Sequence, residues 1–244
     1  MNMTLKPRNG RWDLPCEALG LEEALVCVRR RGDGIEATGE LFLLRLGDGG
    51  ARPLGVVAQA GALAFTEGAY YLFYIAPEGP DGGASLRLRR GVSLPLDTAG
   101  ERVLLADGAS PWTEAWRDPQ LVRDGDGWLI LCGALRRGCD GRRGCVARFR
   151  SRDLVNWREL APIETESGHV VAPGAPCFFS LGDWEYLTFT ALSDRVGTRY
   201  RLRRRGEERW SRPENDGLDG RAFLFGRALR AGGETLLCGV LPTR

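Results

Sequence analysis

The first candidate for chemistry is Asp118, a carboxylate set between Arg117 and Pro119 and preceded by Trp116. An apolar run follows, and an Asp-Gly-Asp-Gly turn then leads into a second apolar run. We therefore expect Asp118 where a strand enters the protein, and its chemistry depends on catalytic partners elsewhere in the chain. The alternative is a structural aspartate that pairs with Arg117 or accepts backbone hydrogen bonds at a turn.

Other side chains could serve the same site. His169 is the sole histidine, and its ordinary pKa suits a general acid or base, although a hydrogen-bonded surface histidine is the simpler interpretation. Trp112 and Trp116 could form a wall on which a ligand stacks, or they could pack in the core. The arginines at 201 and 203–205 are expected to lie on a solvated strand edge.

The amino-acid composition is typical of a soluble globular protein. The chain has 244 residues, 43% apolar and 27% charged, enough for one large domain or two small ones. A net charge of +2 argues against nucleic acid or acidic membranes as partners. No apolar run is long enough to span a membrane, and the first ten residues lack the apolar core of a secretory signal, so we expect a cytoplasmic protein.

The cysteines do not form a metal-binding pattern. There are seven, an odd number, so free thiols are expected in the cytoplasm. Cys132, Cys139 and Cys145 are close in sequence but lack the Cys-x2-Cys spacing of structural zinc sites. We therefore expect no metal and no other cofactor.

A repeated segment, a glycine-containing turn followed by an apolar strand, organises most of the chain. Its markers are Tyr71, Trp128, Trp184 and Glu234, spaced by about 50 to 57 residues. Several short strands in each period of this length predict a β-propeller. The alternative is a β-sandwich with coincidental spacing.

The first 60 residues fit the repeat poorly. Residues 24–29 and 40–46 resemble strands around a turn at 32–34, although 19–26 could instead form a short helix. Trp12 to Pro15 resembles a turn, and no strand of the repeat is expected at Leu14. We predict one all-β domain, a β-propeller over 1–244. Residues 1–60 would form a divergent first blade, which both termini could close, and 61–244 would form four units.

The motifs resemble the five-bladed β-propellers of glycoside hydrolase families 32 and 43. The first match is Arg117-Asp118-Pro119 at the entry of a blade. The second is Ser151-Arg-Asp-Leu-Val-Asn-Trp157, and the third is Gly217-Leu-Asp219-Gly-Arg-Ala-Phe223 with the apolar strand after it. The resemblance covers roughly residues 56–244, in register with the repeat.

The resemblance implies three carboxylates in one site. Glycosidic cleavage uses an acid on one side, a carboxylate opposite and negative charge near the transition state. Asp118 matches the transition-state stabiliser, and Asp13 is the nearest imitation of the first-blade carboxylate. If Pro176 is the family proline, the general acid falls at Gly174, which cannot donate a proton. Substitutes for the acid could be Glu166 or His169, and the implied substrate-binding residues are Trp112, Trp116, Arg117 and Asp219.

Three functional hypotheses follow. The chain could be a glycoside-hydrolase-like propeller with an axial small-molecule pocket at Asp118 that does not hydrolyse glycosides in the ordinary way. Such a pocket would take a sugar-like ligand or an intermediate of a biosynthetic pathway, since positioning alone is a large catalytic effect. It could instead be an active fructosidase- or arabinosidase-like glycosidase with rearranged acids. The third possibility is a binding scaffold without pocket chemistry.

Overall fold

Short apolar runs separated by glycine-containing turns form strands throughout the computed structural model of the chain. The structure describes residues 12–19, 24–30, 38–45, 50–78, 83–106, 109–138, 143–165, 171–191, 197–212, 224–231 and 234–240. The helical structure among these residues is one 3-10 turn, Thr98–Gly100. The predicted all-β class is confirmed.

The first eight strands form one sheet in the order β4-β3-β2-β1-β5-β6-β7-β8. Its first half holds β1 (Trp12–Leu19), β2 (Ala24–Arg30), β3 (Gly39–Arg45) and β4 (Ala51–Ala58). Its second half holds β5 (Gly61–Thr66), β6 (Ala69–Glu78), β7 (Gly83–Gly91) and β8 (Arg102–Ala106). Strands within each half are antiparallel. The halves are joined by parallel pairing of β1 with β5, with Ala18 opposite Leu63 and Leu19 opposite Ala64.

We call the two halves of this sheet the first and second groups. The remaining strands form three further antiparallel groups, each a separate sheet. The third group of the chain holds β9 (Thr113–Asp124), β10 (Gly127–Arg136), β11 (Arg143–Ser151) and β12 (Arg158–Glu164). The fourth holds β13 (Gly174–Leu181), β14 (Trp184–Ala191) and β15 (Gly197–Arg204), and the fifth holds β16 (Leu224–Ala231) and β17 (Glu234–Val240).

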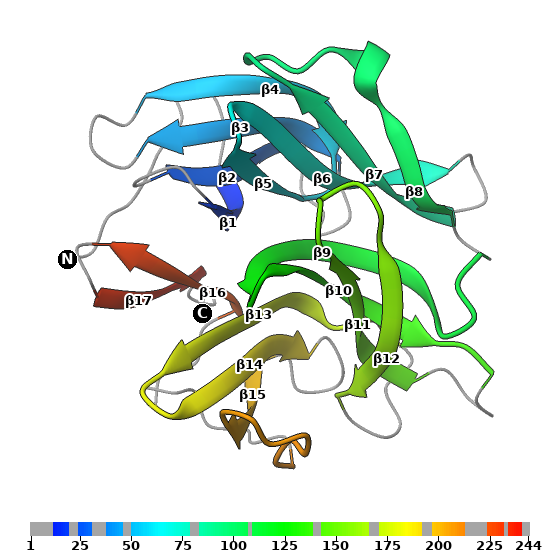
Figure 1. The fold of residues 1–244 in the computed structure, drawn as a ribbon, viewed down its shortest axis with the longest axis vertical. Coiled ribbons are helices and arrows are strands. Elements are labelled where there is room, and N and C mark those ends of the chain that lie inside the picture. The colour runs from blue at the N-terminus through cyan, green and yellow to red at the C-terminus, as the bar shows by residue number, and fades with distance from the viewer. Residues whose placement is uncertain are drawn as a thin grey trace.

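The groups follow one another around a ring, from blue through green and yellow to red (Figure 1). The first strand of each group contacts the first strand of the next: β1 with β5, β5 with β9, β9 with β13, and β13 with β16. β16 also contacts β1, which closes the ring. Such closure protects the inner strand edges of a β-propeller. The propeller fold is confirmed, and five blades remain the predicted number.

The repeat markers fall on corresponding strands. Tyr71, Trp128, Trp184 and Glu234 each lie within the first three residues of the second strand of a group. The strand prediction in each repeat unit is therefore confirmed.

The prediction for the N-terminal segment was partly wrong. β1 runs through the predicted turn from Trp12 to Pro15. Leu14 lies on this first strand of its group, whereas the repeat markers lie on second strands, so the expectation that no marker strand lies at Leu14 is not contradicted. The pairing of β1 with β2 shifts register between Asp13 and Cys16, and Pro15, which has no N–H to donate, lies within that irregularity. The helical alternative for 19–26 is excluded over residues 24–26, which belong to β2. The turn expected at 32–34 lies outside the described residues.

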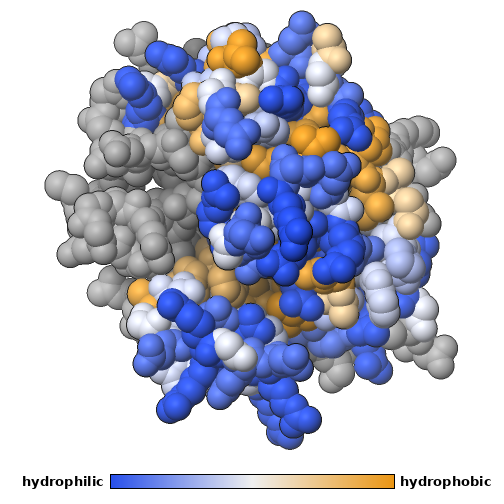
Figure 2. Space-filling model, viewed as in Figure 1, coloured by the Kyte–Doolittle hydropathy of each residue, from blue (hydrophilic) through white to orange (hydrophobic). Residues whose placement is uncertain are grey.

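Apolar side chains pack chiefly between neighbouring groups. One cluster joins the second and third groups and includes Phe73, Trp116 and Ile130; another joins the first and second. A smaller cluster joins β10 and β11 to β14. Figure 2 shows hydrophilic residues over most of the visible face, with apolar residues emerging in a band on its right-hand side.

The Ser151–Trp157 motif forms a turn of the third group that packs against the second group. The Asp153 carboxylate accepts hydrogen bonds from the backbone N–H groups of Val155 and Asn156 at 2.9 and 2.8 Å. These bonds hold the pKa of Asp153 below its usual range. Trp157 packs edge-on against Phe73 at 5.2 Å between ring centroids. This motif therefore stabilises the fold.

A cluster of polar groups links the first and second groups through residues outside the paired strands β1 and β5. Glu101 accepts hydrogen bonds from Tyr74, from Arg87 at 2.6 Å and from Arg89 at 2.8 Å. Arg89 also donates to the carbonyl oxygen of Gly55 in β4, at 2.7 Å. Burial alone would raise the pKa of Glu101, but the hydrogen bonds from Tyr74, Arg89 and Arg87 lower it to about 2. Burial and the bond to Glu101 raise the pKa of Tyr74 to about 12.

Candidate functional site

Asp118 lies within β9 and is 2% exposed. β9 is the inner strand of the third group, the strand that contacts the first strands of both neighbouring groups. The φ of Asp118, +49°, like the +54° of Ala115, is unusual for a residue with a side chain. The pairing of β9 with β10 shifts register on both sides of Gly133, which lies opposite Arg117. Irregularities of this kind redirect side chains, and here the Asp118 carboxylate reaches the neighbouring group.

The Asp118 carboxylate bridges two inner strands. Its Oδ2 accepts a hydrogen bond from the backbone N–H of Ala175 in β13 at 2.9 Å. The same oxygen pairs with Nε of Arg117 at 3.2 Å. Hydrogen bonds to an ionised acceptor are stronger than neutral ones. The structural role considered for Asp118, pairing with Arg117 and accepting a backbone hydrogen bond, is therefore confirmed.

Gly174, the position expected for the missing acid, lies directly before Ala175 and is buried. The hydrogen bond from Ala175 places this segment against Asp118. A carbonyl is also packed close by: a Cβ built on Gly133 would lie 1.7 Å from the Pro173 oxygen. Glycine at 133 thus permits the close approach of β10 to the start of β13.

Gln120, which the sequence analysis missed, supplies a second bridge between β9 and β13. Its Oε1 accepts a hydrogen bond from the Phe178 N–H at 2.7 Å, and its Nε2 donates to the Phe178 carbonyl at 3.3 Å. Nε2 also lies 3.3 Å from the sulfur of Cys177. Gln120 is 3% exposed. The available signal was a polar residue two positions after Asp118, directly before an apolar run.

The two candidate tryptophans have different environments. Trp116 is 2% exposed, packs edge-on against Phe149 at 6.2 Å, and donates its indole N–H to Thr113 at 2.8 Å. Its surroundings favour the core-packing role. Trp112 is 42% exposed just before β9 begins, so it is not a core residue.

The other candidates are placed only in part. Asp13 lies on β1, which contacts β9. Glu166, His169 and Asp219 lie outside the described residues. Glu164, which precedes two of them, forms an ion pair with Arg136.

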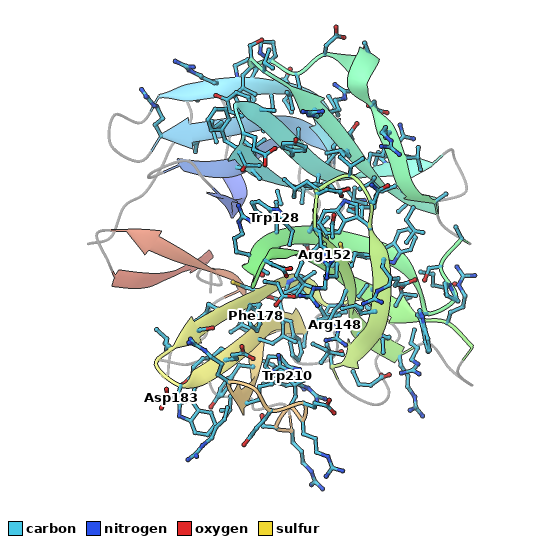
Figure 3. The ribbon with its side chains drawn as sticks, viewed as in Figure 1. Trp128, Arg148, Arg152, Phe178, Asp183 and Trp210 are labelled. Carbon is cyan, nitrogen blue, oxygen red and sulfur yellow. The ribbon has the colours of Figure 1, made fainter. Side chains whose placement is uncertain are left out.

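The arginine-rich strand β15 lies at a sheet edge and Arg204 and Arg205 are exposed, as predicted, but Arg201 and Arg203 are partly buried. Arg203 pairs with Glu185 at 2.7 Å and lies over the ring of Trp210 at 4.5 Å from its centroid. Arg201 donates to the carbonyls of Ser211 and Thr165, both at 3.2 Å. Figure 3 shows Trp210 below Phe178 at this seam between the third and fourth groups. The bond from Arg201 to Thr165 links the fourth group to the residue after β12, whereas the contacts of Arg203 lie within the fourth group and the segment after it.

A surface concavity of about 350 Å³ lies elsewhere on the third group. It is lined by Arg150, Ser151, Arg152, Asp153, Asn156 and Arg158. Asp118 and its partners are not part of it. Within the part of the chain that is described, no group of three or more His, Cys, Asp or Glu side chains could hold a metal ion. Cys132, Cys145 and Cys177 are buried. No helix in the described ranges is long and apolar enough to cross a membrane.

Sequence comparison finds a short similarity. No model of a known protein family matches the chain. A sucrose-6-phosphate hydrolase of Vibrio alginolyticus is 34% identical over 55 residues, which is 22% of this chain and 11% of that protein. So short a match leaves the activity of the whole protein unassigned.

Structural similarity extends over nearly the whole chain. A family 32 β-fructofuranosidase of Bombyx mori, solved with sucrose, has a TM-score of 0.66 at 16% identity, covering 97% of this chain and 56% of that one. A family 43 enzyme of Xanthomonas citri, solved with xylotriose, has a TM-score of 0.64 at 14% identity, covering 96% and 83%. A sucrose-6-phosphate hydrolase of Lactobacillus gasseri has a TM-score of 0.61 at 18% identity, covering 94% and 53%.

This chain thus spans little more than half the length of the Bombyx mori and Lactobacillus gasseri proteins. At these identities the similarity establishes the fold and leaves the reaction open. The chain has the β-propeller fold of glycoside hydrolase families 32 and 43.

Proposed function

We propose that the chain is a glycoside-hydrolase-like propeller that binds a sugar-like small molecule at Asp118 and does not hydrolyse glycosidic bonds in the ordinary way. The observation that carries this proposal is the hydrogen bond from Ala175 to Asp118 at 2.9 Å. It brings the buried Gly174 segment to the retained carboxylate, and this segment offers no proton donor where the resemblance expects one.

The chemistry of glycoside cleavage explains why that difference matters. An oxocarbenium-like transition state needs negative charge nearby and a general acid at the leaving oxygen. Asp118 can supply the charge or bind sugar hydroxyl groups. Without an acid, the leaving oxygen departs unprotonated, and general acid catalysis contributes about 10²- to 10⁴-fold in rate. The loss of the acid alone would therefore slow turnover by about this factor without removing the carboxylate proposed to bind the ligand.

The comparisons support the choice of ligand class. Two of the similar structures were solved with sucrose and with xylotriose. Trp112, half-exposed at the start of β9, offers an apolar face of the kind on which sugar rings stack. We therefore choose sucrose and xylotriose as probes.

Calorimetric titration of the whole chain with sucrose and with xylotriose tests binding. We expect saturable binding of one of them, weakened about tenfold or more by Asp118→Asn, which removes the charge but retains an oxygen for Ala175. Asp126→Asn is the matched control, because Asp126 is 71% exposed and the charge change is the same. Equal affinities in the two variants would contradict the assignment of the site to Asp118.

Hydrolysis is assayed separately with aryl glycosides and with both sugars at high protein concentration. Our proposal predicts no product. Product formation that Asp118→Asn abolishes would instead establish an active glycosidase with rearranged acids. A failure of both sugars to bind would refute the sugar-binding function and favour a scaffold or a ligand of a different class.

A further inference from the structure

The inner strands β9 and β13 are neighbours that belong to different sheets. Two β9 side chains, Asp118 and Gln120, hydrogen bond to the backbone of β13 at Ala175 and Phe178. The Gln120 amide engages both the N–H and the C=O of Phe178, as a neighbouring strand would. These side chains thus act as a substitute for a backbone ladder.

β13 needs this support near its start. Its pairing with β14 shifts register between Gly174 and Cys177, and Ala175 has a φ of +44°. Such a bulge leaves residues outside the regular ladder, so β14 alone does not fix the segment that contacts Asp118. The Pro173 carbonyl rests against Gly133 on one side of the bulge, and Gln120 holds Phe178 on the other.

We propose that Gln120 is a positioning residue, which holds β13 so that the Gly174–Ala175 segment stays against Asp118. Its connection to sugar binding rests on the proposed function above. Gln120 need not touch the ligand: it would keep both sides of the site, the carboxylate on β9 and the bulge on β13, at a fixed separation.

Two variants separate positioning from simple stability. Gln120→Met keeps an unbranched side chain of similar length and removes the amide, so Phe178 loses both bonds. Gln120→Glu keeps an acceptor for the Phe178 N–H and loses the donor. Asp153→Asn is the control, because it weakens the turn between the second and third groups, on a different side of β9.

The primary readout is amide hydrogen exchange at Ala175, whose own acceptor on Asp118 is unchanged in every variant. We expect Gln120→Met to accelerate this exchange about tenfold or more relative to Asp153→Asn, with Gln120→Glu intermediate. We also expect sugar affinity to fall about tenfold in Gln120→Met and to be retained in Asp153→Asn.

Exchange at Ala175 that is no faster in either Gln120 variant than in Asp153→Asn would overturn the positioning role. Faster exchange with unchanged sugar affinity would overturn its link to the ligand site. If the wild-type protein binds neither sugar, the proposed function fails, and exchange at Ala175 alone decides whether Gln120 positions β13. If Gln120→Met does not fold, the same comparison between Gln120→Glu and Asp153→Asn decides.

Discussion

At the junction between the first two strand groups, β1 and β5 pair through their backbones, whereas at the junction between the third and fourth, β9 and β13 are bridged by side chains. The first junction is reinforced by the cluster around Glu101. The second depends on Asp118, Gln120 and the close approach at Gly133.

This difference separates a structural junction from a candidate site. A backbone ladder tolerates many side chains, since every residue except proline carries the same donor and acceptor. A junction bridged by side chains requires particular residues and brings polar groups into the interior. Buried polar networks of this kind are stable only when their members are satisfied.

The largest expected effect is at Gly133, where the side-chain junction is closest. In Gly133→Ala the new Cβ would lie 1.7 Å from the Pro173 carbonyl oxygen, so β13 must move. We expect a loss of about 3 kcal/mol or more in the free energy of unfolding, or failure to fold. Urea denaturation measures this. Gly197→Ala is the control, since its Cβ would meet nothing within 4 Å, and an equal loss there would disprove the steric account.

Glu101→Gln should have the next largest effect, at the backbone-paired junction. The amide keeps the shape of the carboxylate and loses the charge that Arg87 and Arg89 face at 2.6 and 2.8 Å. We expect the free energy of unfolding to fall by about 1 to 3 kcal/mol. Amide hydrogen exchange at Ala175 should be accelerated less in Glu101→Gln than in Gln120→Met. The reverse order would mean that the two junctions are not independent.

Acid titration tests whether the charge of Glu101 stabilises the backbone-paired junction. The folded-state pKa of Glu101, about 2, lies below its ordinary value of 4.5. Its contribution to stability is therefore complete above pH 4.5 and is lost as the pH falls towards 2. The stability gap between wild type and Glu101→Gln should narrow over this window. A gap that stays constant with pH would show that the carboxylate charge is not the stabilising element.

The smallest expected effect is at the turn between the second and third groups. Asp153→Asn weakens hydrogen bonds to two backbone N–H groups at an exposed position. We expect a loss of about 1 kcal/mol in the free energy of unfolding. Thermal unfolding measures it, and sugar affinity should be unchanged. A weakened affinity would extend the site beyond the β9–β13 junction.

Much of the strand pattern was predictable because its signal is local. Tyr71, Trp128 and Trp184 follow turns and begin apolar runs, so their periodic spacing located the second strand of three groups. The tripeptide predicted Asp118 at the entry of a blade, and Asp118 lies in the middle of β9, the first strand of its group. The N-terminal group was read less well, because Pro15 resembles a turn residue yet lies in an irregular part of β1.

The contacts of the site required the three-dimensional arrangement. Gln120 and Phe178 are 58 residues apart, and nothing in either local sequence indicates their pairing. Trp116 could be assigned to the core only once Phe149 and Thr113 were placed beside it. The prediction of a solvated arginine strand was wrong for Arg203, because its partner Glu185 lies across from it on β14.

The most direct test of a sugar site without hydrolysis at the β9–β13 junction is an NMR titration of the whole chain with sucrose and with xylotriose, following the Ala175 amide and the sugar signals together. We predict a saturable shift of the Ala175 resonance, greatly weakened in Asp118→Asn, with the sugar intact after prolonged incubation. Saturable binding that leaves Ala175 unshifted, or the appearance of hydrolysis products, would contradict it.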